Sequence, residues 1–95
     1  MKKRVKKIKR VQSKRVKPEN YFYLCDGGVL KNLKELAKTI RNMPEEHFEH
    51  HVNSNNNDFA NWVIHVLKEA KLGEEMLRTT DKDTTELLLL RKLYY

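Results

Sequence analysis

The sequence contains very little cysteine, glycine or proline. Cys25 is the only cysteine among the 95 residues, which excludes an internal disulfide and a cage of several thiolates around a metal. A single thiol fits a reducing compartment, and we expect the protein in the cytoplasm, or in the nucleus if its source has one. With 3 glycines and 2 prolines, the chain also lacks a Gly/Ser-rich linker. We therefore expect a single domain.

Long apolar runs are missing as well. No run approaches the roughly 18 residues that a membrane span requires. The charged N-terminal stretch is not followed by an apolar segment, so we expect no secretory signal. No Ser/His/Asp set, carboxylate pair or nucleotide-binding fingerprint is present, and Asp26–Gly27–Gly28 is too short to be a phosphate-binding loop. These absences predict a protein that is not an enzyme and has no cofactor.

Negative charge is absent from the first 17 residues, which we call the arm. The arm carries ten cations: Lys2, Lys3, Arg4, Lys6, Lys7, Lys9, Arg10, Lys14, Arg15 and Lys17. The whole chain has 20 Lys and Arg and 13 Asp and Glu, so residues 18–95, the body, hold ten cations and 13 anions and carry a net charge of −3. Because like charges repel, we expect the arm to be disordered when free. Pro18 marks the boundary, since the residue before a proline avoids the helical region.

The arm predicts binding to a polyanion, and nucleic acid is the best fit. Lysine and arginine release condensed counterions when they contact phosphates. Seven lysines against three arginines favour backbone contacts over base readout, so binding to DNA or structured RNA should be largely independent of sequence. Three alternatives remain open. The arm could be a solubilising or targeting tail, it could bind an anionic membrane surface, or it could belong to a protein-interaction adaptor and contact an acidic partner.

Hydrophobic periodicity in the body predicts an all-α fold, a compact bundle of four to five short helices. We expect helices over residues 29–42, 44–52, 58–71 and 84–94. Residues 21–25 are aromatic and strand-prone, but they have no evident partner strand, so we expect an extended segment laid across the helices. Trp62 is expected in the core.

Local signals predict how these elements begin and end. Asp26–Gly27–Gly28 predicts a turn. Gly73 is placed as the left-handed residue that ends the third helix, followed by a short turn of helix over residues 74–78. Asp83 and Glu86 match a capping box, which would start the last helix at Thr84.

The last helix contains four consecutive leucines, Leu87, Leu88, Leu89 and Leu90. Such a helix is apolar around most of its circumference and needs burial on two sides. Either it is sandwiched inside the bundle, or these leucines form an oligomer or docking surface. In the second case the protein would be a homodimer that brings two arms to one duplex, or it would dock on a larger ribonucleoprotein such as a ribosome.

Three histidines, His47, His50 and His51, lie on one predicted helix. His47 and either of the other two have the spacing for two metal ligands on one face, but zinc catalysis would also need a third protein ligand and a general base. We therefore expect one histidine turned into the core and hydrogen-bonded, the others exposed, and no metal.

The body also resembles a small helical domain family of archaea and some bacteria whose function is unknown. The resemblance covers residues 21–72 and rests on these positions, in order: Phe22-x-Leu24-x-Asp26-Gly27, Leu33-x-x-Leu36, Phe48-x-x-His51, Asn57-Asp58-Phe59-x-x-Trp62-Val63 and Val66-Leu67. It implies that Asp26 and Asp58 cap helices, that His51 lies near the Asp58–Trp62 segment, and that the aromatic residues form the core. It also implies an interaction module rather than an enzyme. The arm and the last helix lie outside it.

Overall fold

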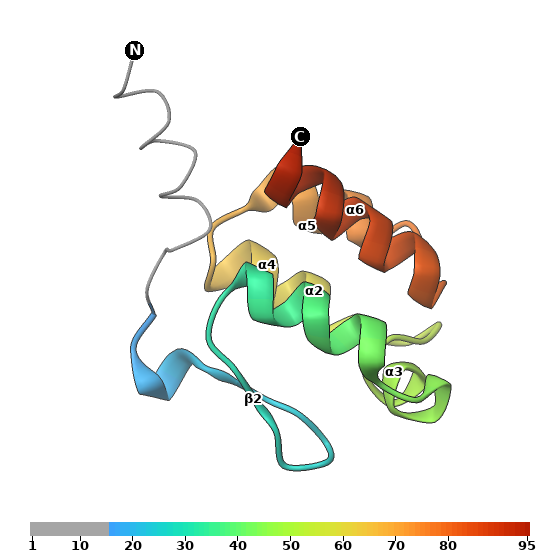
Figure 1. Ribbon diagram of the computed structural model, residues 1–95, viewed down its shortest axis with the longest axis horizontal. Coiled ribbons are helices and arrows are strands. Elements are labelled where there is room, and N and C mark those ends of the chain that lie inside the picture. The colour runs from blue at the N-terminus through green and yellow to red at the C-terminus, as the bar shows by residue number, and fades with distance from the viewer. Residues whose placement is uncertain (1–15) are drawn as a thin grey trace.

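Five α-helices and a small β-hairpin make up the body, and the computed structural model describes residues 16–95 (Figure 1). The elements follow in this order: η1 (Pro18–Asn20), β1 (Phe22–Tyr23), β2 (Val29–Leu30), α2 (Leu33–Asn42), α3 (Glu45–His51), α4 (Asp58–His65), α5 (Ala70–Met76) and α6 (Lys82–Tyr94). The predicted all-α class is confirmed for these residues. Nine of the ten arm cations, and the predicted disorder of the arm, lie outside the described residues.

The aromatic segment after Asn20 has a partner strand, contrary to the sequence prediction. Strand β1 pairs antiparallel with β2, and Phe22 lies opposite Leu30. Gly27 supplies the turn with a φ of 97°, which glycine adopts at little cost. The Asp26 carboxylate accepts a hydrogen bond from the Gly28 N–H at 2.9 Å. The predicted turn is therefore confirmed, but Asp26 closes a hairpin and does not cap a helix.

Helix α2 begins at Leu33, four residues later than predicted, because Val29 and Leu30 form strand β2 of the hairpin. The Asn32 side chain accepts a hydrogen bond from the Glu35 N–H at 2.8 Å and caps the helix there. Leu33, Leu36, Ala37 and Ile40 are buried, as the periodicity predicts. Helix α3 similarly starts at Glu45, and Pro44 takes the N-cap position.

The predicted helix over residues 58–71 is wrong, because the chain breaks between α4 and α5. The Leu67 N–H bonds to the Trp62 carbonyl at 3.2 Å and the Glu69 N–H bonds to the Val63 carbonyl at 3.0 Å. Between them Lys68 adopts a left-handed φ of 62°. The left-handed residue is thus Lys68, a residue type that gives no sequence signal for this conformation.

Gly73 lies inside α5, where the predicted helix end was placed. A Cβ atom at this position would come within 2.2 Å of Cγ1 of Ile64 and 3.1 Å of the Ala60 carbonyl oxygen. The glycine therefore permits close packing of α5 on α4. Of residues 74–78, which were predicted as a separate short turn, the first three continue α5, which ends at Met76.

Helix α6 starts earlier than predicted and packs between α2 and α5 (Figure 1). Its N-cap is Asp81, whose carboxylate accepts a hydrogen bond from the Thr84 N–H at 2.8 Å; the predicted capping box of Asp83 and Glu86 does not form. Leu89 and Leu93 face the core. Among residues 16–95, no helix is long and apolar enough to cross a membrane.

Candidate nucleic-acid interface

The arm joins the body through a short segment that is fixed on helix α4. Val16 is partly buried against the core. The Trp62 indole N–H donates to the Asn20 carbonyl at 2.8 Å, and the Tyr23 hydroxyl donates to the Pro18 carbonyl at 3.1 Å. The arm therefore leaves the body at a defined position.

Phe22 strengthens this attachment by lying among three aromatic rings. Its ring centroid is 5.0 Å from that of Phe59, 5.2 Å from that of His51 and 5.7 Å from that of Trp62. Trp62 is only 7 % exposed, so it is a core residue, as predicted. Trp62 is therefore not available as a stacking surface for a base.

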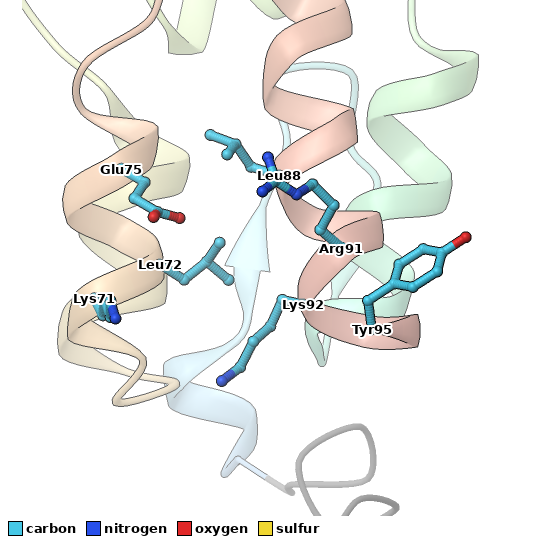
Figure 2. Close-up of a pocket in the computed structure, with 7 residues that line it drawn as sticks. All are labelled: Lys71, Leu72, Glu75, Leu88, Arg91, Lys92 and Tyr95. Carbon is cyan, nitrogen blue, oxygen red and sulfur yellow. The ribbon is translucent and has the colours of Figure 1, made fainter.

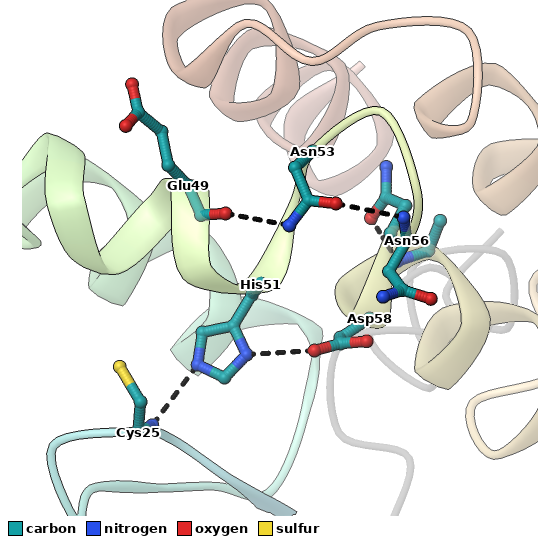
Figure 3. A network of polar contacts seen from close by, with 8 residues as sticks. Cys25, Glu49, His51, Asn53, Asn56 and Asp58 are labelled. Carbon is teal, nitrogen blue, oxygen red and sulfur yellow. Dashed lines mark hydrogen bonds and ion pairs between the residues drawn. The ribbon is translucent and has the colours of Figure 1, made fainter.

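His51 is buried and forms a partly buried polar network with the hairpin and with α4 (Figure 3). Its Nε2 accepts a hydrogen bond from the Cys25 backbone N–H at 3.1 Å. That nitrogen must be unprotonated, so Nδ1 carries the proton and donates to Oδ2 of Asp58, also at 3.1 Å. The expected core histidine is thus His51. Asp58 is its partner and not a helix cap, because Asn57 caps α4.

The other two histidines form no hydrogen bond to this network within residues 16–95, although the ring centroid of His50 lies 4.9 Å from that of His51. His50 is exposed, and His47 is half-buried with Nδ1 3.8 Å from Oδ2 of Asp26. Within residues 16–95, no three His, Cys, Asp or Glu side chains gather closely enough to hold a metal ion. Both nitrogens of His51 already have partners, so this ring is not available as a ligand.

The four leucines of α6 have different environments. Leu89 is fully buried in the core, while Leu88 and Leu90 are partly buried. Leu87 is 54 % exposed. Helix α6 therefore obtains its two-sided burial from α2 and α5, and Leu87 is the leucine of the four that is mainly open to solvent.

Two grooves flank α6 and bring together cations that are distant in the sequence. The groove between α5 and α6 has a volume of about 300 Å³ and is lined by Lys71, Leu72, Glu75, Leu88, Arg91, Lys92 and Tyr95 (Figure 2). The groove between α2 and α6 has a volume of about 360 Å³ and is lined by Lys34, Ala37, Lys38, Arg41, Asn42, Glu86, Leu90, Leu93 and Tyr94. We call the residues that line the two grooves the α6 surface. It holds six cations, two carboxylates and two tyrosines.

Ion pairs leave most of these cations available. Lys92 pairs with Glu69 at 3.3 Å, and Arg41 pairs with Glu86 at 3.4 Å. The remaining four cations of the α6 surface form no ion pair within residues 16–95: Lys34, Lys38, Lys71 and Arg91. Sequence reasoning missed this surface because its residues come from three separate helices, each with acidic neighbours.

Comparison with protein-family models, with curated proteins and with solved structures gives no match. The resemblance of residues 21–72 to the helical domain family therefore stays a prediction. The interface rests on the charges and geometry of this chain.

Proposed function

We propose that the protein is a non-enzymatic nucleic-acid-binding protein that contacts phosphates through the cations of its arm. Binding is largely independent of base sequence, and DNA or structured RNA is the ligand class. We also infer a cytoplasmic location, where the protein acts as a homodimer on one duplex or docks on a larger ribonucleoprotein such as a ribosome.

The observation that carries this proposal is the separation of charge along the chain. Ten cations and no anion precede Pro18, whereas the body has a net charge of −3. The arm alone can span up to about 50 Å when its 15 residues before Val16 are fully extended. The packing of Val16 and the hydrogen bond from Trp62 to Asn20 hold one end of this cationic segment on the body. The other cations of the arm can then follow a phosphate backbone.

The test is a salt titration with the full chain and an arm-neutralised variant. In that variant Lys2, Lys3, Arg4, Lys6, Lys7, Lys9, Arg10, Lys14 and Arg15 are replaced by Gln, while Val16 and Lys17 remain. Fluorescence anisotropy with labelled DNA duplexes and RNA hairpins gives the affinities. If at least six arm cations contact phosphates, native affinity should fall roughly a thousandfold between 50 and 200 mM salt. The neutralised variant should lose most of its affinity and most of this salt dependence.

A scrambled arm is the matched control. It keeps the composition and charge of residues 1–15 in a different order, and we expect native affinity because phosphate contacts by flexible lysines do not require one order. Equal binding by the native and arm-neutralised chains at moderate salt would refute the proposal. If neutralising the arm abolishes binding to an acidic protein partner but not to nucleic acid, the chain is an interaction adaptor instead.

A further inference from the structure

We propose that the α6 surface is a second nucleic-acid contact, which binds unpaired nucleotides by stacking their bases on Tyr94 and Tyr95 and by holding their phosphates with the flanking cations. This inference rests on the proposed function and names the form of nucleic acid that the body accepts. The arm supplies general attraction, whereas the α6 surface selects single strands.

The charge of the α6 surface opposes that of the rest of the body. Six basic side chains against two acidic ones give the groove linings a side-chain charge of +4, and Glu69, which pairs with Lys92, lowers it to +3; the body as a whole has a charge of −3. Conversely, residues 42–67 contain no Lys or Arg and include Glu45, Glu46, Glu49 and Asp58. A polyanion that approaches the body is therefore attracted to α6 and repelled by α3.

The two tyrosines are exposed beside these cations. Tyr94 is 59 % exposed and lines the α2/α6 groove, and Tyr95 is fully exposed and lines the α5/α6 groove. Exposed aromatic side chains next to a cationic groove are the arrangement on which single-stranded nucleic acid binds, because every base has a face that can stack. In a duplex these faces are already stacked on neighbouring bases. The tyrosines can therefore contribute to single-strand binding and not to duplex binding.

The C-terminal end of α6 lies toward the point at which the described chain begins. Figure 1 places the C-terminal end of α6 and the start of the described chain at the same end of the molecule. Figure 2 shows the same relation, with Lys71, Lys92 and Tyr95 on the side of the bundle that faces η1. The side of the bundle that carries Tyr95 is therefore also the side on which the described chain begins.

A second copy of this chain is a poorer occupant of this surface. Two α6 surfaces brought together would place two net positive charges against each other, because each surface has six cations and only two carboxylates. Like charges in a contact are unfavourable, so this surface fits phosphates better than it fits itself.

The main test replaces both tyrosines by Ser in the full chain. Binding is measured by anisotropy with a labelled single-stranded oligonucleotide and with a hairpin duplex of the same length. Because stacking contributes about 1–3 kcal/mol per base, single-strand affinity should fall at least about fivefold while duplex affinity stays unchanged. The double Tyr→Phe variant keeps both rings and should retain native single-strand affinity.

Two exposed leucines provide a matched control. Leu77 is 50 % exposed, and Leu87 is 54 % exposed on α6 but lines neither groove. Replacing both by Ser removes similar exposed apolar area, and we expect less than about a twofold change in affinity for either ligand. Circular dichroism verifies that each variant is folded.

A charge variant tests the phosphate part of the proposal. Replacing Lys38, Lys71 and Arg91 by Gln should lower the salt slope for single strands by about 2, because each phosphate contact contributes about 0.7. Replacing Lys68 and Arg78, two exposed cations outside both grooves, should leave the slope unchanged.

These outcomes separate the inference from the proposed function. Native single-strand affinity in the Tyr→Ser variant, or an equal loss on single strand and duplex, overturns the stacking role of α6. An unchanged salt slope in the charge variant overturns its phosphate contacts. If the arm-neutralised chain loses binding while the Tyr→Ser and charge variants bind like the native chain, the proposed function stands and the role of the α6 surface is refuted.

Discussion

Residues 42–67 and the α6 surface use their polar side chains in different ways. In the first region, His51, Asn57 and Trp62 are buried, and each forms hydrogen bonds inside the body. On the α6 surface, Lys38 and Arg91 face solvent and have no ion-pair partner within the described chain. The residues that look most like an active site in the sequence therefore stabilise the fold, and ordinary lysines are the groups free to bind a ligand.

This difference has a measurable consequence. Substitutions in residues 42–67 and at their contacts with α5 should change the free energy of unfolding and leave nucleic-acid affinity almost unchanged. Substitutions on the α6 surface should do the reverse, because exposed residues contribute little to stability.

Gly73→Ala should produce the largest effect on stability. Alanine in a helix is normally more stable than glycine by about 1 kcal/mol. Here the added Cβ would lie 2.2 Å from Cγ1 of Ile64, and overpacking of this kind costs about 3 kcal/mol. The clash exceeds the gain, so urea denaturation should show a net loss of about 2 kcal/mol.

Removing the clashing atoms tests the cause of that loss. Ile64→Ala deletes both side-chain atoms that come closest to the new Cβ, so the double variant should be more stable than the sum of the two single effects by about 1 kcal/mol. If the two changes in unfolding free energy simply add, the loss in Gly73→Ala does not come from a clash with Ile64.

His51→Leu should come next, with a loss of about 1.5 kcal/mol in unfolding free energy. The substitution leaves the Cys25 N–H and the Asp58 carboxylate without their shared partner. His50→Gln, at the exposed neighbouring position, should change stability by less than about 0.5 kcal/mol. Anisotropy should show unchanged nucleic-acid affinity for both variants. If the His51→Leu variant is folded but binds nucleic acid much more weakly, the contrast between residues 42–67 and the α6 surface is wrong.

Sequence patterns predicted the parts of this fold that depend on regular periodicity. The buried face of α2 was correct because Leu33, Leu36 and Ile40 recur at helical spacing along an uninterrupted helix. The hairpin was missed because β1 and β2 have only two residues each, too few for an alternating pattern to be visible. Val29 and Leu30 also continue the apolar pattern of α2, so the helix was extended over them.

Other features could not be predicted because they depend on tertiary contacts. The break at Lys68 is hidden by Val66, Leu67 and Leu72, which continue a helical apolar pattern across it. A glycine near an expected helix end, such as Gly73, indicates a left-handed cap or a close helix contact equally well. The α6 surface likewise appears only when α2, α5 and α6 are placed side by side.

A smaller effect is expected from the acidic side of the comparison. Replacing the exposed Glu45, Glu46 and Glu49 of α3 by Gln removes their repulsion of the nucleic acid. Because these glutamates belong neither to the arm nor to the α6 surface, salt should screen most of this repulsion. Affinity should rise by at most about threefold at 50 mM salt, with no difference at 200 mM. A larger increase that persists at high salt would mean that nucleic acid contacts α3 directly.

The smallest expected effect concerns Asp81, which caps the helix that carries the α6 surface. Hydrogen bonds from the Thr84 side chain and from its backbone N–H lower the pKa of the Asp81 carboxyl below its ordinary value of 3.8. A lowered pKa in the folded state stabilises the protein above the pKa of the unfolded chain, and this stabilisation is lost as pH falls through the folded pKa. Asp81→Asn keeps an oxygen that accepts from Thr84 but cannot ionise. Its urea midpoint should therefore lie below the native midpoint at neutral pH and approach it in acid. Native and Asp81→Asn profiles that run parallel across the acidic range would show that the charge of the cap does not stabilise α6.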